Sequence, residues 1–154
     1  VITEIPPWVS IASISVSVIA IMLGAITLGI MIVIRQREIA RWKQAGITFV
    51  KGPASANYRG HASVSIPVKG NGILALTNSD LRFVRYLPRS EFVIPFDQIT
   101  TVEHRQTWKG SYRGRPVLVI RYRDDDREDE IGFIVRHLAD WSTAIAQAAD
   151  ITAP

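Results

Sequence analysis

One uninterrupted apolar stretch limits what this chain can fold into more than any other feature of its sequence. Residues 9–34, VSIASISVSVIAIMLGAITLGIMIVI, contain 26 positions without a charged side chain. About 20 apolar residues in a helix cross the hydrocarbon core of a bilayer. We therefore predict a transmembrane helix over residues 9–34, with the rest of the chain held at the membrane surface. A cleaved signal peptide is disfavoured because the run is long and no basic region precedes it.

The charges on either side of the run predict its orientation. Residues 1–8 contain no Lys or Arg, whereas four basic residues follow the run closely: Arg35, Arg37, Arg41 and Lys43. Positive residues near a span stay on the cytoplasmic side. We therefore expect a single-pass protein of the cell membrane, with its N-terminus outside and its C-terminal domain in the cytoplasm. Trp42 is expected in the headgroup layer, and the four cations beside anionic membrane lipid.

Small residues within the run follow alternating spacings of three and four, which places them on one stripe of a helix: Ser10, Ser13, Ser17, Ala20, Gly24 and Thr27. Helices in lipid associate where small residues allow their backbones to approach. The stripe therefore indicates a packing face for another membrane protein or for a second copy of this chain. The alternative is a plain anchor, since small residues are common in such helices.

The chain beyond the run divides into two parts. Residues 35–57 are expected to form a juxtamembrane helix and a linker, and residues 58–150 a domain. Alternating or apolar segments predict strands at 62–68, 73–77, 81–87, 91–95, 100–108, 116–123 and 128–136, followed by an amphipathic helix at 137–149. This order predicts a mainly-β small barrel of two orthogonal antiparallel sheets, capped by the C-terminal α-helix.

Composition and motifs argue against catalysis. Cysteine is absent, so no disulfide and no thiolate zinc site is expected. Residues 51–154 hold 14 basic and 12 acidic side chains, so a broad polyanion-binding surface is not expected either. His61, His104 and His137 lack metal-ligand spacing, and no nucleophile elbow or phosphate-binding loop is present. We expect no catalytic, metal or cofactor site and no nucleic-acid partner.

Part of the domain resembles a known superfold. The segments GNGILALTNSDLRFVRY, FVIPFDQITTVE, VLVIRY and EIGFIVRHLADWSTAI resemble the PH-like superfold, and most of all its bacterial PH-like and GRAM-like branches. The matching positions are Gly72, Leu74, Leu76, Thr77, Leu81, Phe83, Ile94, Pro95, Ile99, Val102, Phe133 and Trp141. The resemblance covers residues 62–149 and implies a module that binds lipid headgroups or proteins. In place of the basic first hairpin of eukaryotic PH domains, this chain has a single Lys69.

One segment combines aromatic and basic side chains. Residues 105–115, RQTWKGSYRGR, contain six candidate contact residues: Arg105, Trp108, Lys109, Tyr112, Arg113 and Arg115. Such a mixture suits an anionic membrane surface or an acidic soluble protein. The alternative is a solvated hairpin tip.

Two functions remain open at this point. In the first, the chain is a non-enzymatic membrane protein whose PH-like module binds or scaffolds protein or anionic lipid. In the second, it is an accessory or assembly subunit of a larger membrane complex, docked through the stripe of small residues. An autonomous anchor would tolerate any apolar helix in place of residues 9–34, whereas a docked subunit would not.

Overall fold

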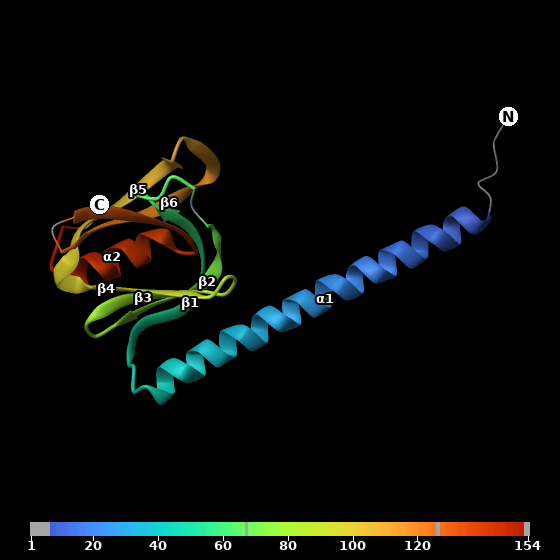
Figure 1. The fold of residues 1–154 in the computed structure, drawn as a ribbon, viewed down its shortest axis with the longest axis horizontal. Helices are drawn as coiled ribbons and strands as arrows, with labels where there is room; N and C mark the ends of the chain where they lie inside the picture. Colours follow the sequence, from blue (N-terminus) through green and yellow to red (C-terminus); the bar gives the residue numbers. More distant parts are fainter. Residues whose placement is uncertain (1–6, 67, 126, 153–154) are drawn as a thin grey trace. The chain divides into compact units, whose positions relative to one another are not determined.

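The computed structural model describes residues 7–66, 68–125 and 127–152 and divides into two units, residues 1–37 and residues 38–154 (Figure 1). Most of helix α1 (Pro7–Gln44) belongs to the first unit, and its last seven residues belong to the second. The second unit also contains all of the strands and helix α2 (Leu138–Ala148).

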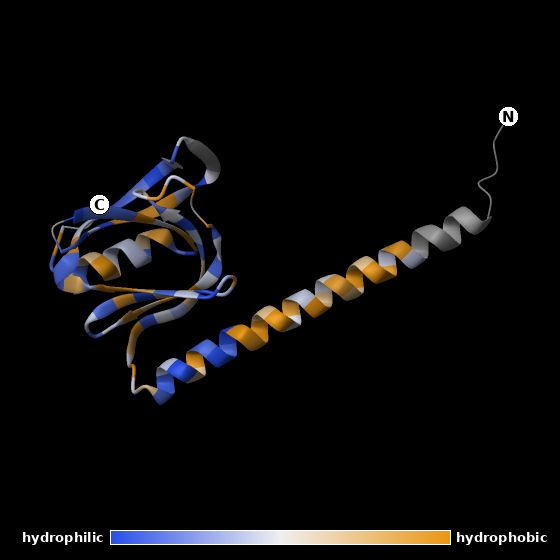
Figure 2. Cartoon of the chain, viewed as in Figure 1, coloured by the Kyte–Doolittle hydropathy of each residue, from blue (hydrophilic) through white to orange (hydrophobic). Residues whose placement is uncertain are grey.

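Helix α1 is long and apolar enough to cross a membrane, by its length and composition. Its apolar part gives way to polar residues beyond position 34 (Figure 2). The predicted helix is thus present, and it runs without interruption through residues 35–44, as expected for the juxtamembrane segment. The helix ends just before Gly46, whose φ of 74° lies in the left-handed region that glycine adopts without steric cost.

Seven antiparallel strands follow: β1 (Phe49–His61), β2 (Gly70–Thr77), β3 (Asp80–Arg85), β4 (Ser90–Pro95), β5 (Ile99–Trp108), β6 (Ser111–Asp124) and β7 (Arg127–Val135). They form one sheet in the order β4-β3-β2-β1-β7-β6-β5. The predicted pair of orthogonal sheets is not confirmed. β1 pairs with both β2 and β7, which joins the two groups of strands into one sheet, and β4 and β5 remain its edges.

The segment predicted as a linker is part of the sheet, which corrects the expected boundary at residue 58. β1 begins at Phe49 and includes Pro53, a residue that cannot donate a backbone hydrogen bond. The sheet accommodates Pro53 because pairing with β7 starts only at Ala56, and the register with β2 shifts between Lys51 and Ala54. The turn chemistry of Gly52-Pro53 concealed this strand in the sequence.

The segment 62–68, predicted as a strand, is a loop between β1 and β2 in its described residues. The glycine-rich 70–72 segment, which signals a turn, instead opens β2. Glycine is required at position 72 because a Cβ atom there would lie 2.0 Å from the carbonyl oxygen of Val84 on the neighbouring strand. Close strand packing therefore explains this glycine.

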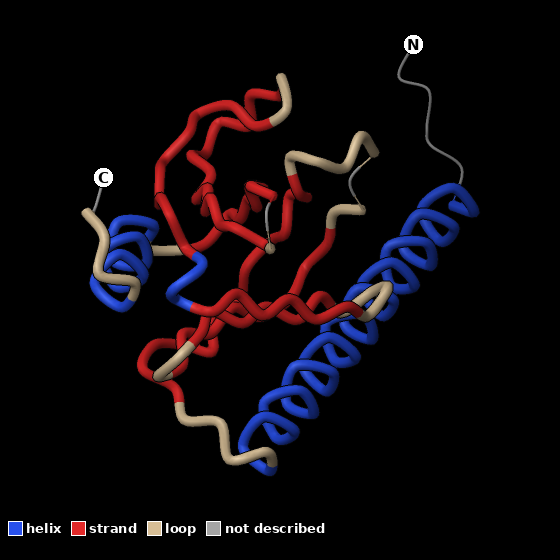
Figure 3. The backbone as a smooth tube through the Cα atoms, turned by 60° about the vertical axis from the view of Figure 1, so that its left-hand side comes forward, coloured by secondary structure: helices blue, strands red, loops and turns tan. Residues whose placement is uncertain are grey.

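The core lies inside the bend of the sheet. Aromatic and aliphatic side chains of the strands, among them Phe83, Phe133 and Ile131, are fully buried there. The predicted terminal helix is confirmed as α2, and its apolar face places Trp141 and Ile145 in the same core. In Figure 3 the strands bend around this interior and α2 lies at one end of it.

Candidate functional site

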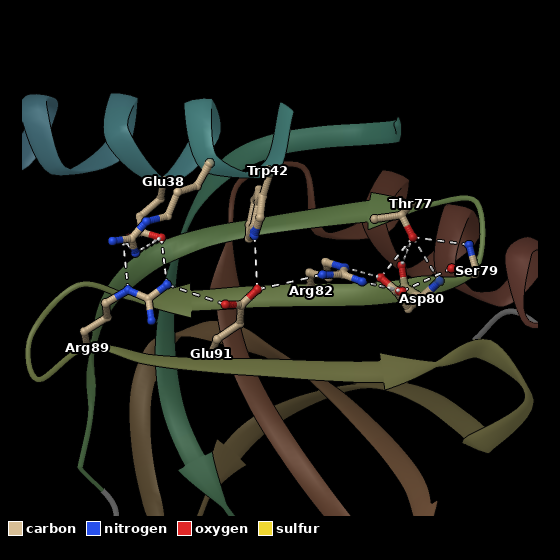
Figure 4. A network of polar contacts seen from close by, with 9 residues as sticks. Glu38, Trp42, Thr77, Ser79, Asp80, Arg82, Arg89 and Glu91 are labelled. Atoms are coloured by element: carbon tan, nitrogen blue, oxygen red, sulfur yellow. Dashed lines mark hydrogen bonds and ion pairs between the residues drawn. The ribbon is translucent and has the colours of Figure 1, made fainter. Parts of the chain in front are cut away.

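The end of α1 is built into the domain through Trp42. The indole is 3% exposed, and its ring centroid lies 5.7 Å from that of Phe49. Its Nε1–H donates a hydrogen bond to Oε1 of Glu91 on β4, at 3.1 Å (Figure 4). This corrects the expectation that Trp42 lies among lipid headgroups. Tryptophan is amphipathic, and here the polar Nε1 atom of the ring has its hydrogen-bond partner within the protein.

Glu38, one helical turn earlier, makes the second attachment. Its carboxylate accepts two hydrogen bonds from Arg89, from Nε and Nη2, each at 3.0 Å. Arg41 donates to the same carboxylate at 3.2 Å. The two hydrogen bonds from Arg89 join α1 to the turn between β3 and β4, 51 residues further along the chain.

The polar network continues across the sheet (Figure 4). Arg82 lies between Glu91, at 3.9 Å, and Asp80, whose Oδ1 accepts from Nε at 2.7 Å. Asp80 also accepts from Thr77 and Ser79. Burial would raise the pKa of Asp80, but the hydrogen bonds from Arg82 and Thr77 outweigh burial and lower it. The carboxylate is therefore held ionised, and each charged side chain of this network has an opposite charge beside it.

A hollow of about 240 Å³ lies beside Asp80, lined by Gly46, Ile47, Thr48, Thr77, Asn78, Ser79, Asp80 and Arg82. Its charged groups are Asp80 and Arg82, which pair with each other. The hollow therefore offers no free cation to an anionic ligand, and we assign the network a structural role.

The remaining basic residues after the apolar run are placed differently. Arg37 and Lys43 are exposed, Arg41 is exposed but bonded to Glu38, and Arg35 is half-buried. Arg37 and Lys43 thus keep the accessibility that a contact with lipid phosphates requires.

Only part of the contact patch predicted at residues 105–115 is exposed. Trp108 is 5% exposed, packs with Val117 and Val119, and donates from Nε1 to the carbonyl oxygen of Arg59 at 3.2 Å. Gly132 allows this packing, since a Cβ atom there would lie 2.9 Å from the indole. Trp108 is therefore a core residue, which corrects its assignment as a contact residue.

Arg105 is also occupied within the domain. Its guanidinium donates to both carboxylate oxygens of Glu130, at 2.7 and 2.8 Å, and to Glu103 at 2.9 Å. The hydrogen bonds from Arg105, helped by Arg121, lower the pKa of Glu130 to about 2. Arg105 is thus paired with carboxylates on the sheet. This corrects its prediction as a cation available for contact with a partner.

Lys109 and Arg115 remain exposed. Lys109 and Gly110 form a two-residue turn, with φ of 50° and 71°, between Trp108 and its partner Ser111. This turn is shorter than the connection 109–115 that the predicted strands 100–108 and 116–123 leave between them, because 111–115 belong to β6. The side chains of Tyr112 and Arg113 lie outside the described residues. The Lys109 ammonium contacts the carbonyl oxygen of Val64 in the β1–β2 loop.

Two histidines take part in polar contacts that the sequence did not indicate. His61 lies 3.4 Å from Asp129 and 3.1 Å from the Tyr122 hydroxyl, and burial lowers its pKa. Ser63 donates its hydroxyl proton to Asp129 at 2.6 Å. These contacts join strands 61 residues apart in sequence, a separation that short motifs cannot reveal.

The second pair is His104 and Ser142, 2.8 Å apart. Ser142 is buried and donates its hydroxyl proton to the carbonyl oxygen of Ala139. The pair therefore attaches α2 to β5. Among the described residues, no three His, Asp or Glu side chains come together as a metal-binding group.

The predicted stripe on α1 lies on an exposed helix. Ser17, Ala20, Gly24 and Thr27 are exposed, and Thr27 donates its hydroxyl to the carbonyl oxygen of Leu23 at 2.8 Å. Intrahelical bonding of this kind lets a hydroxyl enter lipid. The side chains of Ser10 and Ser13 lie outside the described residues.

Comparisons with known proteins give distant similarities. No family model and no curated protein matches the sequence. The chain is similar to the C-terminal domain of an unknown protein from Leishmania infantum, with 17% identity, a TM-score of 0.48, and coverage of 70% of this chain and 88% of that one. It is also similar to a structure concerning mutations in SsgB that correlate to longitudinal cell division during sporulation of Streptomyces coelicolor. That match has 14% identity, a TM-score of 0.36, and coverage of 66% and 87%.

Proposed function

We propose that this chain is a non-enzymatic, single-pass membrane protein whose PH-like domain binds or scaffolds other molecules at the cytoplasmic surface. The observation that carries this proposal is the attachment of Glu38 and Trp42 to the domain. Three residues, 35–37, separate the apolar run from the first residue of the domain unit. A module joined so closely to a span stays at the membrane surface and meets partners there at high effective concentration.

The PH-like interpretation is supported by the order of elements, seven antiparallel strands followed by one helix, together with the sequence resemblance over residues 62–149. The bound molecule is proposed to be anionic lipid or a protein partner. Among the described side chains, Lys109 and Arg115 are exposed cations of the segment 105–115, and Arg37 and Lys43 are exposed cations of the juxtamembrane segment.

A second candidate function is an accessory subunit of a membrane complex. It is favoured by the exposed Ser17, Ala20 and Gly24 on α1, which suit a close helix contact. The two functions differ in which part of the chain holds the partner.

Extraction of the full chain from its membranes in polymer-bounded lipid discs tests both. We expect specific proteins or anionic lipids to be enriched with the wild-type chain. A variant in which residues 9–34 are replaced by an unrelated apolar helix should retain them if the domain is the binding module, and lose them if the span is. No enrichment with either chain would contradict both proposals.

A further inference from the structure

The domain exposes large apolar side chains mainly at one place. In the described residues, Val64, Ile66 and Val68 of the β1–β2 loop are exposed, Ile66 by 86%. Leu87, in the turn between β3 and β4, is 68% exposed. The turn lies beside the end of this loop, because a Cβ atom on Gly70 would be 3.4 Å from the carbonyl oxygen of Leu87. We call Val64, Ile66, Val68 and Leu87 the apolar loop surface.

Polar contacts hold the backbone beneath this surface. Arg85, itself buried, donates to the carbonyl oxygens of Val68 and Pro88 and so joins the loop to the turn. The Lys109 ammonium contacts the carbonyl oxygen of Val64, and Ser63 donates from its N–H and hydroxyl to Asp129. The loop is thus supported at both ends while its apolar side chains stay in water. Burial of one such side chain is worth about 1.5–3 kcal/mol, so their exposure indicates an interaction surface.

Two lysines flank the apolar loop surface. Lys69 ends the loop, and Lys109 lies against its other side. Three carboxylates, Glu128, Asp129 and Glu130, lie beside Ala62 and Ser63 at the start of the loop, and each is paired within the domain. Apolar side chains flanked by cations match the interface of an anionic bilayer, where apolar groups enter the acyl boundary and cations meet phosphates.

The attachment of the domain favours a bilayer over a soluble protein as the occupant. Arg89, in the same turn as Leu87, is bonded to Glu38, which lies four residues after the last residue of the apolar run. The turn is therefore connected through one ion pair to the residue at which the domain begins. The anchoring proposed above therefore holds the whole domain, this loop included, beside the bilayer at high effective concentration.

We propose that the apolar loop surface inserts Val64, Ile66, Val68 and Leu87 into the interfacial layer of the anionic membrane that carries the chain, with Lys69 and Lys109 on its lipid phosphates. This inference rests on the membrane anchoring proposed above. It assigns the loop as a second membrane contact, separate from the span.

The test uses the full chain in nanodiscs of phosphatidylcholine, with or without phosphatidylglycerol. Because the chain has no cysteine, Ser65→Cys gives one labelling site, between Val64 and Ile66, for an environment-sensitive fluorophore. Thr143→Cys, an exposed position on α2, is the reference site. We expect a blue shift at position 65 and loss of quenching by aqueous iodide in anionic discs, with position 143 unchanged.

Matched variants distinguish insertion of this loop from nonspecific adsorption of the domain to the bilayer. Ile66→Ser with Val68→Ser should restore iodide quenching at position 65. Val50→Ser with Val93→Ser, which changes two other exposed apolar residues of the domain, should not.

Quenching at position 65 that remains complete in anionic discs would overturn the proposal while the disc-bound chain still supports the anchor. Shielding that appears only after cell extract is added would overturn it in favour of a protein partner. Failure of the chain to enter discs would contradict the anchor and this inference together.

Discussion

Trp42, near the end of a helix that could cross a membrane, donates its indole N–H to Glu91 on an edge strand of the domain, 49 residues away in the sequence. The ring is buried against Phe49. The last turns of α1 therefore belong to the fold of the domain and are not a free tether. This relationship can be tested through the stability of the domain.

Trp42→Ala should lower the free energy of unfolding by about 3–5 kcal/mol, because it leaves a cavity where a large ring was buried. Trp42→Phe keeps much of the ring and loses the hydrogen bond, so it should cost about 0.5–1.5 kcal/mol. Lys43→Ala, at the exposed neighbouring position, should change the value by less than about 0.5 kcal/mol. Denaturant unfolding of the purified chain, followed by circular dichroism, measures all three. Equal stability of Trp42→Ala and the wild type would contradict the attachment.

The ion pair of Glu38 and Arg89 should show energetic coupling. In a double-mutant cycle with Glu38→Gln and Arg89→Gln, we expect a coupling energy of about 0.5–3 kcal/mol, since the carboxylate is buried and contacts Arg89 through two bonds. The exposed pair of Arg123 and Glu128, 3.6 Å apart, is the control and should give less than about 1 kcal/mol. Additive effects at Glu38 and Arg89 would show that the pair does not hold the helix end.

Glu130 should make the domain sensitive to acid. Hydrogen bonds from Arg105 lower its folded pKa from an ordinary 4.5 to about 2. Its stabilising contribution, on the order of 2 kcal/mol, is therefore fully present above about pH 4.5 and is lost as the pH falls toward 2. Glu130→Gln should be less stable than the wild type at pH 7, and the difference should shrink between pH 4.5 and 2. Unfolding midpoints across this range measure it, and a pH-independent difference would contradict the assignment.

The stripe of small residues should matter only if the span holds a partner. Ser17→Leu with Gly24→Leu replaces two small residues by bulk that keeps helices apart, while leucine still favours insertion. We expect loss of any membrane protein that co-purifies through the span, with the domain still folded. Ile14→Leu with Ile21→Leu, on another face, is the control. If neither pair of changes alters co-purification, α1 serves only as an anchor.

Local patterns in the sequence predicted much of the fold. The apolar run, the strands at β2 to β7 and the amphipathic spacing of Trp141 and Ile145 each appear as a helix or strand in the structure. These predictions succeeded because residue periodicity reports local structure directly. The strand β1 was missed because the turn residues Gly52 and Pro53 interrupt it, and its bulges absorb them.

The candidate contact residues were harder to predict, because burial and ion pairing depend on residues far away in the chain. Trp108 looked like an exposed aromatic of a basic hairpin, but the missing side chain of Gly132 leaves room for its ring in the domain. Arg105 looked like a free cation, yet Glu130 lies beside it on the sheet. The exposed Ile66 was hidden in a segment whose alternation predicted a strand.

We propose that the domain works at the cytoplasmic face of a membrane, held there by one span. Labelling of single cysteines in intact cells with a membrane-impermeant maleimide tests it most directly, because the chain has no cysteine of its own. With Gln147→Cys, at an exposed position of α2, we predict labelling only after the cells are permeabilised. With Thr3→Cys, before the span, we predict labelling in intact cells. Labelling of the Gln147→Cys chain in intact cells would contradict the account.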